Sequence, residues 1–118
     1  MPTSELKVAA RTVHDVAVLD VKGTLDSTTV GQLEKAFQGA LKENKKRFVF
    51  NLSDAEYISS IGWGVFVSNL KSIREKGGDI LLCGMSPSIQ HIYELLDFEK
   101  IIKAFPDESG ALGVFHKK

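Results

Sequence analysis

Two adjacent serines, Ser59 and Ser60, stand where a hydroxyl group could receive a phosphate. They end a polar loop and precede Gly62-Trp63-Gly64, after which the chain is apolar. We therefore expect them at a helix N-terminus, where unpaired backbone N–H groups and the helix dipole favour negative charge. The same position suits a serine that only caps the helix. The pattern leaves both roles open.

Signatures of catalysis, metal binding or cofactor binding are not found in the sequence. The Gly-x-Gly lacks the third glycine of a dinucleotide fingerprint, and there is no Gly-Lys-Ser/Thr phosphate loop. His14, His91 and His116 do not have the spacing of metal ligands. Cys83 lies in an apolar run, where a thiol is usually inert. We expect no catalytic residues, no metal and no cofactor, and hence a protein that is not an enzyme.

Composition limits the classes of partner. The chain has 118 residues, 43% of them hydrophobic and 25% charged, which suits a single domain over residues 1–118. Lys plus Arg equals Asp plus Glu at 15 each, so the overall charge favours neither direct nucleic-acid binding nor an anionic membrane. No apolar run is long enough for membrane insertion, and a single cysteine excludes an internal disulfide. We expect a cytoplasmic protein, with the oligomeric state left open.

Hydrophobic periodicity predicts strands before helices at the start of the chain. Residues 6–12 alternate as in a half-buried strand, and residues 16–21 form a second strand rich in β-branched residues. Gly23 is expected to break that strand, and Asp26 or Ser27 to cap the helix that follows. The apolar stripe of this helix comprises Val30, Leu33, Phe37, Ala40 and Leu41.

The rest of the chain alternates strand and helix. Expected strands are residues 48–52, 79–83 and 101–105, and expected helices begin near residue 60, at Ser86-Pro87 and at residue 107, the first of them stopping at Gly77. The order is β-β-α-β-α-β-α-β-α. It predicts an α/β fold with a mixed, mostly parallel β-sheet and helices packed on it.

Four segments in the correct order resemble the STAS-domain family of bacterial anti-sigma factor antagonists. They are Val21-Lys-Gly-Thr-Leu-Asp26, Tyr57-Ile-Ser-Ser-Ile-Gly-Trp-Gly64, Gly77-Gly-Asp-Ile-Leu-Leu-Cys-Gly-Met-Ser-Pro87 and Leu96-Asp-Phe-Glu-Lys-Ile-Ile102. Aligned on its glycines, the second segment puts the family's phosphorylated serine at Ser60, with Ser59 as the alternative. The sequence departs from the family at three positions, with Ser59 in place of Asp, Ile61 in place of Ser or Ala, and Trp63 in place of Leu.

The resemblance implies a switchable binding module. The unphosphorylated form would bind a kinase-type anti-sigma factor and release a sigma factor, that kinase would phosphorylate Ser60, and a phosphatase would reverse the change. The loops expected to form the contact face are residues 23–27, 56–64 and 84–88. Within them, the partner-binding candidates are Thr24, Asp26, Ser27, Tyr57, Ser59, Ser60, Ile61, Gly62, Trp63, Met85 and Ser86.

The sequence leaves several interpretations open. Asp26 is either a helix cap or part of the contact surface, and Trp63 and Met85 are either an apolar patch beside Ser60 or core. The substitution of Asp by Ser59 favours an alternative function, a non-switching STAS adaptor in a larger signalling or lipid-transport complex. A third hypothesis is a nucleotide-binding protein that uses Asp26.

Overall fold

A computed structural model describes residues 6–116, so residues 1–5 and 117–118 of the expected domain lie outside the description. The sheet has five strands in the order β1-β2-β3-β4-β5. The strands are β1 (Lys7–Val13), β2 (Val16–Leu25), β3 (Arg47–Ile58), β4 (Asp79–Cys83) and β5 (Lys103–Phe105). The helices are α1 (Val30–Lys42), α2 (Ser60–Ser68), α3 (Leu70–Glu75), α4 (Pro87–Leu95) and α5 (Glu108–His116), with a 3₁₀ turn η1 (Phe98–Lys100).

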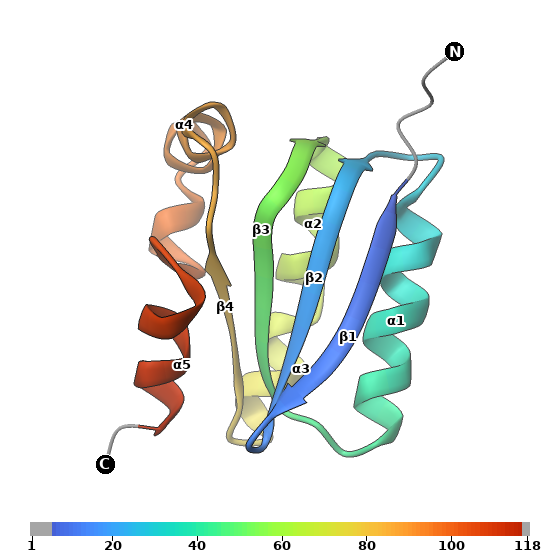
Figure 1. Ribbon diagram of the computed structural model, residues 1–118, viewed down its shortest axis with the longest axis vertical. Helices are drawn as coiled ribbons and strands as arrows, with labels where there is room; N and C mark the ends of the chain where they lie inside the picture. Colours follow the sequence, from blue (N-terminus) through green and yellow to red (C-terminus); the bar gives the residue numbers. More distant parts are fainter. Residues whose placement is uncertain (1–5, 117–118) are drawn as a thin grey trace.

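The expected mixed α/β sheet is confirmed. Strand β1 pairs antiparallel with β2, and all later neighbours are parallel. Figure 1 shows α5 alone on the near face of the sheet and α1, α2 and α3 behind it, with α4 at one end. Because the parallel strands share one direction, the carboxyl ends of β2 and β3 lie at the same edge, beside the start of α2.

Each face of the sheet has its own hydrophobic cluster, because side chains alternate along a strand. In β3, Phe48 and Phe50 belong to the large cluster under α1–α4, whereas Val49 belongs to the smaller cluster under α5. All three are fully buried. The expectation that this segment is covered on both faces is therefore confirmed.

Two strands run further than the sequence indicated. Gly23 does not break β2, because glycine accepts its positive φ of 102° and the strand continues to Leu25 with a shift of register after Gly23. Strand β3 continues to Ile58 because its polar residues pair with the extended β2, with Thr24 opposite Tyr57. The segment expected to be a loop is thus an ordered strand that leads directly into Ser59.

Among the helices, the main difference from expectation lies within the one predicted from residue 60. The long helix predicted from residue 60 is divided at Asn69, which separates α2 from α3. The side chain of Asn69 donates to the carbonyl of Val65 at 3.1 Å and so satisfies a backbone group at that break. Strand β4 has the predicted bounds, and α4 begins at Pro87 with Ser86 as its N-cap, both as expected.

Candidate functional site

The two serines at the start of α2 have different environments. Ser59 is the N-cap, with its Oγ accepting from the backbone N–H of Gly62 at 3.4 Å. Its own backbone N–H donates to the carbonyl of Leu25 at 2.9 Å, which fastens the end of β3 to the end of β2. Ser60 is the first helical residue and is exposed, and its hydroxyl makes no hydrogen bond within residues 6–116. Capping therefore belongs to Ser59 and leaves the Ser60 hydroxyl accessible.

The absence of a side chain has different consequences at Gly62 and at Gly64. A Cβ on Gly62 would lie 2.7 Å from Leu25 Cγ and 2.9 Å from Ile58 Cγ2, both in the core. Gly62 thus allows α2 to pack closely on the strand ends, which fixes the position of Ser60. A Cβ on Gly64 would meet nothing within 4 Å. Gly64 instead keeps the outer face of α2 small.

Asp26 closes the turn before α1. Its Oδ1 accepts from the backbone N–H of Thr28 at 2.9 Å and from the Thr28 hydroxyl at 2.7 Å. Its carbonyl accepts from the N–H groups of Thr29 and Val30. The Thr28 hydroxyl is the main cause of a lowered pKa of Asp26, since it stabilises the carboxylate. The helix-capping interpretation accounts for these contacts, although the cap is an Asx turn several residues before Val30 rather than a direct N-cap.

Two of the three expected contact loops meet at the sheet edge. Leu25 is paired with Ile58, so residues 23–27 and 56–64 are adjacent. The third loop, residues 84–88, reaches the site through Ser88, which lines a pocket together with Tyr57. Ser86 is engaged as the N-cap of α4, where its Oγ accepts from the N–H of Ile89 at 3.3 Å.

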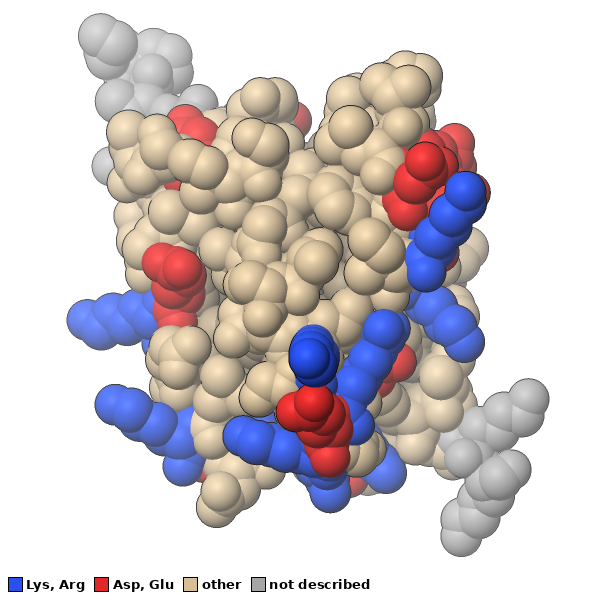
Figure 2. All heavy atoms as spheres, turned by 180° about the vertical axis from the view of Figure 1, so that it is seen from behind, with Lys and Arg blue, Asp and Glu red and all other residues tan. Residues whose placement is uncertain are grey.

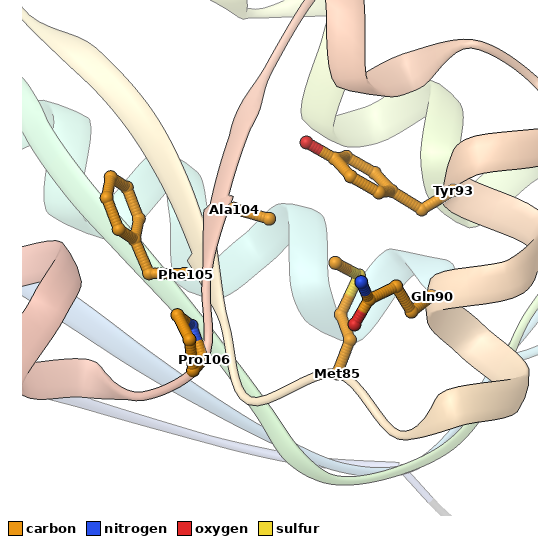
Figure 3. A pocket seen from close by; sticks show the side chains of 6 residues that line it. All are labelled: Met85, Gln90, Tyr93, Ala104, Phe105 and Pro106. Atoms are coloured by element: carbon orange, nitrogen blue, oxygen red, sulfur yellow. The ribbon is translucent and has the colours of Figure 1, made fainter.

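Met85 belongs to a different part of the surface. Its side chain is half-buried against the main core cluster. Figure 3 shows it pointing between α4 and β5, toward Gln90 and Tyr93, in a cavity of about 170 Å³. The residues that line this cavity come from position 85, α4 and residues 104–106. Met85 is therefore not part of the pocket lining that includes Tyr57.

Trp63 is part of the core rather than an exposed apolar patch, which settles the two alternatives left by the sequence. Its side chain is 1% exposed. The indole ring stacks on Phe98 with a centroid distance of 5.0 Å and on Tyr93 with 6.1 Å. A helix of alternating glycines and apolar residues gives little indication of its inner face, which is why the sequence left Trp63 open.

The exposed apolar residues beside Ser60 are Tyr57 and Ile61, which are 56% and 51% exposed. Helix α2 contains no charged residue. Figure 2 shows that the middle and upper part of the face over α1–α3 has almost no Lys, Arg, Asp or Glu, which gather below and at the margins. The exposed neighbours of Ser60 in the sequence, Tyr57 and Ile61, are thus uncharged, and a partly apolar surface of this kind suits a protein partner.

Sequence reasoning missed the contribution of α4 to this end of the molecule. Ile89, His91 and Ile92 line the same pocket as Glu56 and Tyr57. No local signal in the sequence tells which strand end the inner face of α4 approaches. Residues 6–116 contain no cluster of three or more His, Cys, Asp or Glu that could hold a metal ion. No helix within that range is long and apolar enough to cross a membrane.

Comparisons with known proteins find relatives in sequence and in fold. The chain is 24% identical over 98 residues to the anti-sigma F factor antagonist of Paenibacillus polymyxa. The matched region covers 82% of this chain and 84% of the relative. An anti-sigma factor antagonist from Mycobacterium paratuberculosis superposes with a TM-score of 0.83 at 20% identity, over 96% of each chain.

The same fold is found in the Bacillus protein SpoIIAA. Its unphosphorylated form gives a TM-score of 0.80 at 16% identity, covering 95% of this chain and 98% of that one. Its phosphorylated form gives 0.68 at 15% identity, covering 92% and 98%. The model of the STAS domain matches residues 7–111, which is most of the sequence. The chain belongs to the STAS domain family.

Proposed function

We propose that this protein is an anti-sigma factor antagonist whose unmodified form binds a kinase-type anti-sigma factor and so releases a sigma factor. Membership of the STAS domain family and the similarity to the antagonist of Paenibacillus polymyxa support this class. The observation that carries the proposal is the contrast between Ser59, whose side chain caps α2, and Ser60, whose hydroxyl is exposed.

Ser60 is the proposed phosphate acceptor. Its Oγ would take the γ-phosphate of ATP from the kinase partner and lose its proton, and ADP would leave. A phosphate at the first residue of α2 lies near the positive end of the helix dipole and the unpaired N–H groups of the first turn, so the fold tolerates it. The neutral cap of Ser59 adds no carboxylate to repel it. Ser59 is a poorer acceptor because its hydroxyl is half-buried and already engaged.

Phosphorylation would act on binding rather than on folding. It adds about −1.5 to −2 charges at pH 7. The proposed contact surface contains the uncharged helix α2 and the apolar side chains of Tyr57 and Ile61. A partner docked there would have to bury the phosphate without a compensating cation from this chain, which is unfavourable. The phosphorylated form would therefore release the anti-sigma factor until a phosphatase restores Ser60.

The test is a pull-down from the native cells followed by binding curves with the recovered partner. Unmodified protein and Ser60→Ala are expected to bind equally, whereas Ser60→Asp is expected to bind at least about 30-fold more weakly, as for about 2 kcal/mol of unfavourable buried charge. Ser59→Asp is the matched control, because it adds the same charge one residue earlier. Aspartate is a good N-cap, so its charge is held against the helix start and binding should change little. Recovery of no kinase-like partner, or equal binding by Ser60→Asp, would contradict the proposal.

One observation supports the runner-up, a non-switching STAS adaptor. Ser59 stands where the family has an aspartate, and a kinase that reads that carboxylate would find only a capping hydroxyl. An adaptor would carry no phosphate under any growth condition and would elute as part of a large complex. Its binding would be the same for Ser60→Ala and Ser60→Asp.

A further inference from the structure

A pocket of about 390 Å³ lies beside the turn that carries Ser60, between the end of β3 and α4. Its apolar lining residues are Ile58 from β3, Trp63 from α2, and Ile89 and Ile92 from α4. Figure 1 places α4 at the end of the molecule where β3 leads into α2, and the surface in Figure 2 is notched at this end. The volume is within the range of ligand sites, so the pocket has room for a large apolar side chain.

The walls of the pocket are held in place by contacts within the chain. The backbone N–H of Ser59 donates to the carbonyl of Leu25 at 2.9 Å, which fixes the end of β3. On the other side, the hydroxyl of Tyr93 in α4 donates to the carbonyl of Ile102, and Trp63 stacks on Tyr93 with a centroid distance of 6.1 Å. A pocket that is formed before binding favours affinity, because little ordering is needed when it is filled.

Exposed groups at the mouth of the pocket determine the chemistry of what can enter it. Glu56 and Tyr57 are exposed and belong to the lining, which includes no Lys or Arg. Within residues 6–116, the carboxylate of Glu56 takes part in no ion pair. An unpaired carboxylate beside an exposed aromatic ring favours a cationic group in a partner, through ion pairing and cation–π attraction.

We propose that this pocket receives an apolar side chain of the anti-sigma factor, and that a basic group beside that side chain pairs with Glu56. This role rests on the proposed function, because the pocket borders the same contact face. Ile58 lines the pocket and is followed by Ser59, the cap of α2, so a partner that fills the pocket also covers the start of α2. The pocket would supply affinity and the choice of partner, whereas Ser60 would supply the switch.

Binding curves with the recovered anti-sigma factor test the pocket through variants of α4. Ile92→Phe narrows the pocket from its wall, and Ser88→Phe places a ring at its mouth without altering a buried residue. Each is expected to raise the Kd at least about tenfold, because the partner's side chain no longer fits. Leu95→Phe is the matched control on the same helix, at a residue that is 64% exposed and outside the lining, and should leave the Kd unchanged.

A reversal of charge tests the basic group of the partner. Glu56→Lys is expected to raise the Kd about tenfold at low salt and by less at high salt, because salt screens exposed charges. Glu75→Lys makes the same change of charge at an exposed residue at the end of α3. It should change the Kd by less than about twofold at either salt concentration.

The isoleucine methyl groups test the pocket in the unaltered chain. The sample is the complex of isoleucine-methyl-labelled protein with unlabelled anti-sigma factor. Ile92 is expected to show nuclear Overhauser effects to apolar protons of the partner, whereas Ile80, which is fully buried in the core, is expected to show none. This measurement decides the proposal even if a variant does not fold.

Failure of the pocket role differs from failure of the proposed function. If the anti-sigma factor binds but Ile92→Phe and Ser88→Phe behave like Leu95→Phe, or if Ile92 shows no contact with the partner, the pocket role is wrong and the proposed function stands. Equal effects of Glu56→Lys and Glu75→Lys would overturn the pairing with Glu56. Recovery of no kinase-like partner would overturn both the pocket role and the proposed function.

Discussion

The starts of α1 and α2 lie at the same edge of the sheet, yet their polar groups are used differently. Before α1, the Asp26 carboxylate and carbonyl are bonded to Thr28, Thr29 and Val30. Before α2, a single bond from Gly62 N–H to Ser59 Oγ caps the helix, and Ser60 stands outside it with a free hydroxyl. The first turn is complete within itself, whereas the second leaves a hydroxyl and an apolar surface available. This contrast makes the turn before α2 the stronger candidate for binding.

Of the differences between the two helix starts, the close packing of α2 should have the largest effect on stability when it is disturbed by substitution. Gly62→Ala forces a methyl group against Leu25 and Ile58, so overpacking outweighs the gain in helix propensity. We expect the free energy of unfolding to fall by about 1–2 kcal/mol, measured by urea denaturation. Gly64→Ala is the control, because its new Cβ is in open space and alanine is the better helix former. It should stabilise the protein by about 0.5–1 kcal/mol. Equal effects at the two glycines would contradict the packing argument.

Replacing each serine by alanine in turn tests how differently the two contribute to stability. Ser59→Ala removes the N-cap of α2 and should lower the free energy of unfolding by about 1 kcal/mol. Ser60→Ala removes an exposed hydroxyl and should change it by less than about 0.5 kcal/mol. Both values come from chemical denaturation at neutral pH. A larger loss at Ser60 than at Ser59 would mean that Ser60 is the structural residue.

The smallest expected effect is a dependence on pH of the stability that the turn before α1 contributes. The pKa of Asp26 is lowered in the folded state, so its stabilising contribution is present above the unfolded pKa and is lost as pH falls through the folded pKa. Asp26→Asn keeps an oxygen for the Thr28 bonds but removes the charge. The difference in stability between the two proteins should therefore shrink in acid. A difference that is constant from acid to neutral pH would show that the charge does not contribute.

The sequence predicted the elements best where local signals coincide. Strand β4 ends at Cys83 as expected, and Ser86-Pro87 marks the start of α4. The ends of β2 and β3 were misjudged because a polar segment becomes a strand only through pairing with a distant one, and local composition does not report that pairing. Propensity also could not show that Asn69 divides the helix after Ser60.

The candidate site was predicted in position but not in detail. The order of polar loop, two serines and Gly-x-Gly placed Ser59 and Ser60 at the start of a helix. It could not say which serine caps, because that depends on where β3 ends through its pairing with β2, and Leu25 is opposite Ile58. The approach of α4 to Tyr57, and hence the pocket, is a purely tertiary feature.

The most direct test of the central claim is to map phosphate after incubation of the purified protein with its kinase partner and ATP. The wild-type chain and Ser59→Ala are expected to gain one phosphate, located on Ser60 by fragmentation of the intact protein, and Ser60→Ala is expected to gain none. Phosphate on Ser59, or incorporation that persists in Ser60→Ala, would contradict the assignment of the two serines.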